Sequence, residues 1–208
     1  MYGYECRTLN FQLVPEKAWS KNLRSLIPNW HEVSFHVRMG GECSVCGKMT
    51  GELEAHEIWD YDDKTHEQTL RKIVPVCPDC HNAIRVEHAC QTGTFNEALE
   101  QYMKVNGIDI DEAYSDLEEA RKVWQERSLH EWKLDEEKLK EKVTALTGIS
   151  CEIDKPINGR YYANVPYELK DTAKEMGAKW DNLRKMWYFA SQKTRSAWQK
   201  KYGNNSPN

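Results

Sequence analysis

Apolar positions recur with a helical period through the middle of the chain. Three helices are predicted there, over residues 94–107, 111–132 and 136–146, because each segment carries apolar residues three or four positions apart. The first opens with Thr94-Phe95-Asn96-Glu97, a pattern in which the threonine hydroxyl and the glutamate carboxylate satisfy free backbone N–H groups. The apolar stripes of these helices predict a packed core rather than a cofactor site.

Shorter elements are predicted on both sides of this helical middle. A strand is expected over residues 53–59, followed by a charged loop over 60–67. An apolar run at 73–76 then leads into a helix over 81–88. The remaining expected elements are helices at 18–27 and 167–176 and strands at 161–165, 179–180 and 186–189.

The character of the sequence changes near residue 150. Pro156 and Gly159 interrupt the helical pattern and mark a boundary. Residues 1–150 are therefore expected to form the larger domain, and residues 151–208 a small accessory domain with a polar tail. The predicted fold class is α+β.

The overall composition is typical of a globular protein and excludes a membrane span. The 208 residues are 39% hydrophobic and 11% aromatic, with a mean hydropathy of −0.82 and no long apolar run. The opening residues Met1-Tyr2-Gly3-Tyr4 lack the basic and apolar segments of a secretion signal. We expect a cytoplasmic protein without a membrane partner, in a compartment where thiols stay reduced.

Four of the seven cysteines form two closely spaced pairs. Cys43/Cys46 and Cys77/Cys80 each follow the pattern C-x2-C, with 30 residues between the pairs. Four thiolates at this spacing can converge tetrahedrally on zinc, and a reducing compartment favours a metal site over disulfides. The pairs therefore predict a structural Zn²⁺ site. The other three cysteines are expected to be small buried side chains: Cys6, Cys90 and Cys151.

Charge is unevenly distributed along the chain. The formal net charge is −4, and residues 97–137 hold 13 acidic and 5 basic side chains. Residues 168–201 reverse this balance, with 4 acidic and 9 basic side chains. A phosphate-facing surface is therefore expected at the C-terminal end or at a metal site, and not on the middle helices.

The residues between and after the cysteine pairs resemble the HNH endonuclease family. Leu53-Glu54-Ala55-His56-Glu57-Ile58-Trp59 follows the first pair, and Cys80-His81-Asn82 opens a helix after the second. Further similarity over about residues 15–140, including Arg127-Ser128, resembles a bacterial and phage subfamily. The resemblance implies a ββα-metal core with flanking helices, and a nuclease that uses Mg²⁺ or Mn²⁺ at the scissile phosphate.

The resemblance implies roles for individual residues, with two registers open at the strand. In one, His56 is a ligand of the catalytic ion and Glu57 takes the place of the family's general-base histidine. In the other, His56 is the base and Ala55 stands where a ligand is expected. His81 or Asn82 supplies the ligand from the helix.

The helix after the second cysteine pair also offers basic side chains. His81, Arg85 and His88 are spaced to share one helical face. Arg85 is expected to contact phosphate, and His88 to be a surface residue. The alternative for His81 is a hydrogen bond to a zinc-bound thiolate.

Residues 160–190 resemble a small domain of unknown function that occurs beside primase-like and mobile-element proteins. The segment Gly177-Ala178-Lys179-Trp180-Asp181 carries most of this similarity. Its aromatic side chains can stack bases while its basic side chains meet phosphates, or they can close the core of a small sheet-plus-helix domain. Together with Arg85, the expected nucleic-acid contacts are Lys179, Arg184 and Lys185.

The leading functional hypothesis is a metal-dependent DNA endonuclease or nickase of the HNH type, from a phage or mobile element. Its expected catalytic residues are His56, Glu57, His81 and Asn82. The alternative is a catalytically silent zinc protein of the same fold that binds nucleic acid or inhibits a protein partner.

Overall fold

The computed structural model describes residues 7–18, 26–27, 29–151, 158–163, 165–182 and 184–202. Most of the predicted helix at 18–27 and the polar tail lie outside these residues. In chain order the elements are α2 (Trp30–Arg38), β1 (Glu54–Asp62), β2 (Glu67–Val76), α3 (Pro78–Ile84), α4 (Val86–Thr92), α5 (Phe95–Asn106), α6 (Ile110–Ser128), α7 (Glu136–Thr147), β3 (Tyr161–Ala163), η2 (Tyr167–Leu169), α8 (Lys170–Glu175), β4 (Lys179–Asp181), β5 (Met186–Phe189) and α9 (Gln192–Tyr202).

The chain divides into two compact units. The first unit joins residues 1–21 to residues 34–135, and the second joins residues 22–33 to residues 136–208. Helix α7, which the sequence-based boundary at residue 150 assigns to the larger domain, groups here with the second unit. The expected mixed α+β class with small sheets is confirmed.

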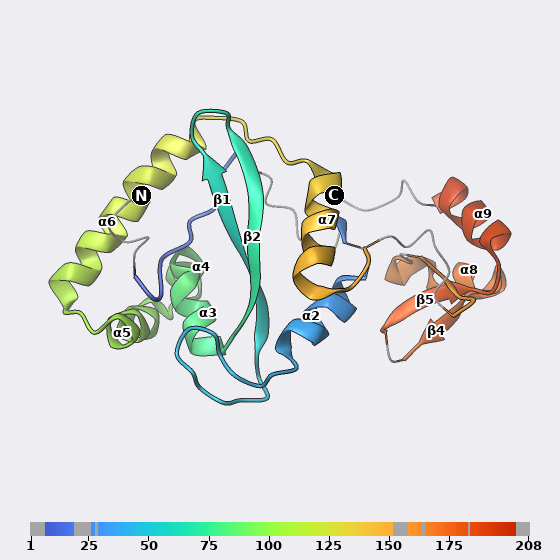
Figure 1. Cartoon of the computed structure of the whole chain (residues 1–208), viewed down its shortest axis with the longest axis horizontal. Helices are drawn as coiled ribbons and strands as arrows, with labels where there is room; N and C mark the ends of the chain where they lie inside the picture. Colours follow the sequence, from blue (N-terminus) through green and yellow to red (C-terminus); the bar gives the residue numbers. More distant parts are fainter. Residues whose placement is uncertain are drawn as a thin grey trace. The chain divides into compact units, whose positions relative to one another are not determined.

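A long antiparallel hairpin of β1 and β2 dominates the first unit (Figure 1). Its register runs from Glu54 opposite Val76 to Asp62 opposite Glu67, with an irregularity between Ile58 and Trp59. The predicted loop at 60–67 is therefore wrong, since only residues 63–66 turn. The Asp62 side chain closes this turn by accepting hydrogen bonds from the backbone N–H groups of residues 64 and 65.

Helices α3 to α6 follow the hairpin and enclose the core of the first unit (Figure 1). The N-terminal segment completes that core, where the ring of Phe11 stacks on Tyr102 with centroids 3.9 Å apart. Fully buried Val76 and Val86 connect the end of the hairpin to the helices.

Two helix predictions in this unit are corrected. The single helix expected over 81–88 is broken at Arg85, whose backbone (φ −96°, ψ 49°) separates α3 from α4. Helix α6 ends at Ser128, short of Trp132, and the indole N–H of Trp132 donates to the carbonyl of Arg127 in its last turn. The chain beyond then pairs with the hairpin through a bridge between Glu67 and Lys133.

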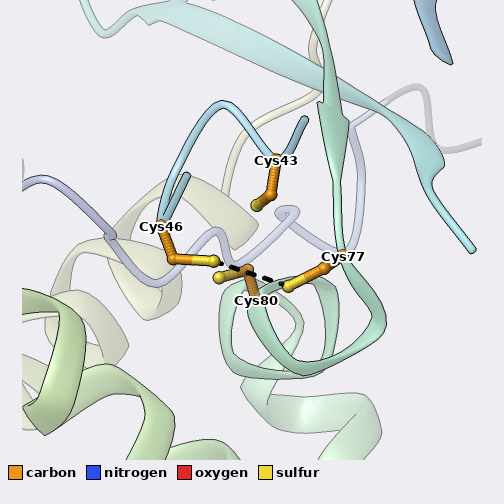
Figure 2. Close-up of side chains that lie close together, drawn as sticks. All are labelled: Cys43, Cys46, Cys77 and Cys80. Carbon is orange, nitrogen blue, oxygen red and sulfur yellow. Dashed lines mark hydrogen bonds between the residues drawn. The ribbon is translucent and has the colours of Figure 1, made fainter. Parts of the chain in front are cut away.

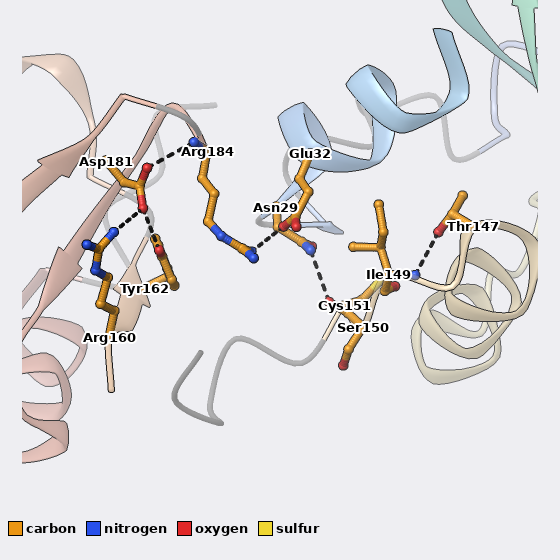
Figure 3. A network of polar contacts seen from close by, with 10 residues as sticks. All are labelled: Asn29, Glu32, Thr147, Ile149, Ser150, Cys151, Arg160, Tyr162, Asp181 and Arg184. Atoms are coloured by element: carbon orange, nitrogen blue, oxygen red, sulfur yellow. Dashed lines mark hydrogen bonds and ion pairs between the residues drawn. The ribbon is translucent and has the colours of Figure 1, made fainter. Parts of the chain in front are cut away.

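The C-terminal part of the second unit is a three-stranded antiparallel sheet in the order β3-β5-β4. One face packs against α8 and α9 around Ala173, Phe189 and Trp198. The opposite face holds the buried carboxylate of Asp181, which accepts hydrogen bonds from the Tyr162 hydroxyl at 2.6 Å and from Arg160 at 2.7 Å (Figure 3). Helix α9 was not predicted, because its sequence is almost entirely polar around Trp198.

The cysteines outside the two pairs fall into different environments. Cys151 is buried, as expected, whereas Cys90 on α4 is exposed. The prediction for Cys90 is therefore wrong, and Cys6 lies outside the described residues. Within the described part of the chain, no helix is long and apolar enough to cross a membrane.

Candidate metal centre and histidine pair

The first cysteine pair lies in a tight loop between α2 and β1. The N–H of Cys43 donates to the carbonyl of Lys48, and the N–H of Gly47 donates back to the carbonyl of Cys43. Gly47 has φ +73°, a conformation that favours glycine in a turn of this kind. Both the N–H and the hydroxyl of Ser44 donate to the carbonyl of Pro75, so the loop is fixed to the end of β2.

The second pair lies where β2 passes into α3. Cys77 precedes the first helical residue, Pro78, and Cys80 belongs to the first turn of the helix. Figure 2 shows the four sulfur atoms converging from the loop and from this strand-to-helix junction. All four lie within 4.8 Å of one another, with the Sγ atoms of Cys46 and Cys77 at 3.7 Å.

The surroundings of the sulfurs act on their ionisation in opposite directions. Burial opposes ionisation of Cys43, but backbone hydrogen bonds from Cys46, Cys77 and Val45 outweigh it and lower its pKa to about 7. Burial raises the pKa of Cys80, and its sulfur accepts a hydrogen bond from the Gln101 side-chain amide at 3.1 Å.

Four cysteine sulfurs in this arrangement could hold a structural metal such as zinc. Among the described residues, these four form the one group of three or more Cys, His, Asp or Glu side chains with ligand atoms this close. A full set of four thiolates leaves no open coordination position for a substrate. The centre therefore suits stabilisation of the fold.

A pair of histidines lies beside this metal centre. The ring centroids of His56 on β1 and His81 on α3 are 5.1 Å apart, in an edge-to-face arrangement. Glu54 Oε2 is 3.1 Å from His81 Nδ1, and Gln12 Oε1 is 3.3 Å from His56 Nε2. The structure thus brings together His56 and His81, two of the predicted site residues.

Strand alternation decides which β1 residues can join this pair. Successive side chains point to opposite faces of a strand, and the register is regular from Glu54 to Ile58. Glu54 and His56 therefore share the face that contacts α3, whereas Glu57 belongs to the opposite face. Glu57 does not lie with the histidines on which its predicted catalytic role depends.

Both imidazoles are in surroundings that favour the neutral form. Burial is the main cause that lowers the pKa of His56 to about 3, and the neighbouring His81 and Arg85 add to it because they oppose a second positive charge. Burial also lowers the pKa of His81, although the Glu54 carboxylate opposes this shift. A neutral imidazole can bind a metal ion or accept a proton.

An open depression of about 700 Å³ lies next to His81. Its lining includes Glu54, His81, Arg85 and His88, so the three basic residues predicted to share a helical face do border one space despite the break at Arg85. Asp79, Glu97, Glu100 and Lys104 complete its charged lining. Arg85 and His88 are both exposed.

Asn82 is engaged in holding two helices together. Its Nδ2 donates to the carbonyl of Thr94 at 3.3 Å, and its Oδ1 accepts from the Thr94 hydroxyl at 3.1 Å. The predicted capping box is therefore wrong in its contacts: the Thr94 hydroxyl bonds to Asn82 and does not cap α5. Of the two predicted ligands on α3, His81 is the one beside His56.

The predicted nucleic-acid contacts in the C-terminal sheet differ in availability. Lys179 and Lys185 are exposed. Arg184 instead forms an ion pair with Glu32 of α2, and its guanidinium lies 5.3 Å from the centroid of the Tyr162 ring (Figure 3). Its charge is thus largely compensated within the second unit.

Sequence reasoning missed two members of the histidine cluster. Glu54 lies two positions before His56, and the period of a strand is the signal that would have identified it. Gln12 comes from a segment 44 residues away, and no local pattern points to it.

A sequence model of one family matches part of the chain. It is described as a domain of unknown function (DUF5710) and matches residues 160–200. This agrees with the similarity expected for the C-terminal segment. No curated protein matches the chain, and no solved structure does.

Proposed function

We propose that the first unit is a metal-dependent DNA endonuclease or nickase of the HNH type. One observation carries the proposal: an antiparallel hairpin followed by a helix, joined by four converging cysteines, holds His56 and His81 with ring centroids 5.1 Å apart. This hairpin-and-helix arrangement is what the ββα-metal resemblance implies. The adjoining depression is open to a bulky substrate.

The positions of the side chains support one of the two registers left open by the sequence. His56 is assigned as the general base because its ring lies against His81, 5.1 Å between centroids, and burial keeps its imidazole in the neutral form that can accept a proton. Glu54 takes the place of the ligand that Ala55 cannot supply, since Glu54 is on the same face of β1 and 3.1 Å from His81.

The remaining groups would orient the substrate. Glu54 and His81 would hold the Mg²⁺ or Mn²⁺, which when bound neutralises charge on the scissile phosphate and stabilises the leaving oxygen. Arg85, exposed on the rim of the depression, would contact a neighbouring phosphate. His56 would take the proton of the attacking water once Gln12 releases its ring.

The test is cleavage of supercoiled plasmid without added metal and with Mg²⁺, Mn²⁺ or Ni²⁺. His56→Ala and His81→Ala should each lower the cleavage rate by at least about 100-fold, the contribution of a positioned general base or an ion ligand. His88→Ala, an exposed histidine on the same rim, is the matched control and should retain activity. Metal-dependent nicking that persists in both site variants would exclude this site.

A catalytically silent scaffold is the second candidate. It is favoured by the enclosure of His56, which is only 7% exposed and has its Nε2 engaged by Gln12. This candidate expects no cleavage with any metal from protein that retains its zinc, together with binding to nucleic acid or to a protein partner. The same plasmid assay, with zinc content measured on each sample, separates the two candidates.

A further inference from the structure

Two tryptophans meet at an edge of the C-terminal sheet. Trp180 on β4 pairs with Trp187 on β5, so both side chains lie on the same face. Their ring centroids are 5.4 Å apart at an interplanar angle of 64°. Trp187 packs against the core of the sheet and is held in place by it, whereas Trp180 is 44% exposed.

Lysines of α8 stand beside these rings and beside a third aromatic. Lys174 Nζ is 5.9 Å from the centroid of the Trp187 ring. One helical turn earlier, Lys170 Nζ is 3.8 Å from the ring of Tyr167, which is 75% exposed. We call these five residues the aromatic–lysine strip.

The segment that carries the strip is basic overall. Residues 158–202 hold ten basic and four acidic side chains, in a chain whose net charge is −4. Among the described residues, the acidic partner of Lys174 is Asp171, at 2.8 Å, and both side chains of this pair are more than half exposed. An exposed pair of this kind contributes little and is readily exchanged for another anion. The second unit thus presents exposed aromatic rings and lysine side chains on one surface, and a polyanion could contact both.

We propose that the aromatic–lysine strip binds single-stranded nucleic acid. Bases can stack on the exposed rings of Trp180 and Tyr167 while Lys170 and Lys174 meet the backbone phosphates. A duplex would bring the same phosphates but keeps its base faces inside the stack, so it cannot use the tryptophan. The proposal does not rest on the nuclease proposal, because the strip and the histidine pair belong to different units.

Only part of the aromatic and basic set that the sequence offers in this segment is available for binding. Tyr162 and Phe189 are buried and unavailable for stacking, and Arg184 is paired with Glu32. Tyr188 is covered by the guanidinium of Arg160, 4.7 Å from its ring centroid. The exposed rings that remain are at the Trp180 edge.

The test is fluorescence anisotropy of the full chain with a labelled oligo-dT, without added divalent cation and over a series of salt concentrations. Trp180→Ala should weaken binding at least about fivefold, the loss expected for one stacked base, and Trp180→Phe should largely restore it. Lys174→Gln should lower the slope of log K against log salt by about 0.7. Oligo-rU and a duplex of matched length are compared in parallel, and the duplex should bind more weakly.

Matched controls separate the strip from general effects. Phe35→Ala removes an aromatic of comparable exposure on α2, and Lys142→Gln removes an exposed lysine of α7; both should leave binding unchanged. The proposal is overturned if Trp180→Ala, folded as judged by thermal unfolding, binds as the wild type does. Equal or tighter binding of the duplex, or competition by polyglutamate as effective as by oligo-dT, would also overturn it. Oligo-dT binding is measured without divalent cation and plasmid cleavage with it, so failure of the nuclease leaves this result standing.

Discussion

Two histidines of the first unit, His56 and His88, lie in different surroundings. His56 is buried behind His81, while His88 is exposed on α4. A buried imidazole whose folded pKa is about 3, against 6.5 for the unfolded chain, takes up its proton only in the unfolded state. Protonation therefore favours unfolding as the pH falls below 6.5.

This difference gives a prediction for stability. The free energy of unfolding should fall by about 0.8 kcal/mol between pH 7.5 and pH 6.0 on account of His56 alone. His56→Gln should remove this part of the pH dependence, whereas His88→Gln should show the same pH dependence as the wild type. Urea unfolding of the three proteins at both pH values measures it. An identical pH dependence in wild type and His56→Gln would contradict the burial of this ring.

Single residues also show where sequence reasoning reaches its limit. The cysteine spacing is a local pattern, so the sequence alone is enough to identify the four candidate ligands. The partners of the histidines depend on the face of β1 and on a distant segment: Glu54 is set by strand alternation and Gln12 by tertiary packing. Glu57 was favoured by its place next to His56, and that adjacency puts it on the other face of the strand.

At the scale of elements, the helices of the middle region were predicted well because their apolar faces repeat over many residues. The errors fall where short-range patterns compete with packing. The turn of the hairpin spans fewer residues than its charged sequence suggested. The helix break at Arg85 contains no glycine or proline, so no sequence signal predicts it. Trp198 is the one large buried apolar side chain of helix α9, and a single apolar position gives no periodic signal.

The junction of α3 and α5 supplies a second prediction. Thr94→Ala should destabilise the protein by about 1 kcal/mol, because it removes a hydrogen bond to the part-buried Asn82 amide. A double-mutant cycle should give a coupling of about 0.5–1.5 kcal/mol between Thr94 and Asn82, since the two side chains are in direct contact. The cycle between Thr94 and Glu97 should give none. Denaturant unfolding measures both cycles. Coupling between Thr94 and Glu97, with none between Thr94 and Asn82, would support the capping box instead.

At the scale of the molecule, each unit has its own core. The core of the first unit includes Cys43, Cys77 and Cys80 themselves, so the candidate metal centre and the apolar packing form one structure. The core of the C-terminal sheet is built around Phe189 and Trp198 and contains no residue of the cysteine cluster. Metal binding should therefore be coupled to the folding of one unit and not of the other.

Hydrogen exchange measured by mass spectrometry tests this separation. A zinc chelator should raise amide exchange across residues 43–106, where the hairpin and α3 to α5 depend on the metal, and leave residues 160–200 protected. Cys46→Ser should reproduce the effect without chelator, because Cys46 is exposed and its replacement removes a ligand without opening a cavity. Cys90→Ser, also exposed but outside the cluster, should not. Exchange that rises equally in both regions would mean that the metal supports the whole chain, and the strip on the C-terminal sheet would then depend on zinc as the histidine pair does.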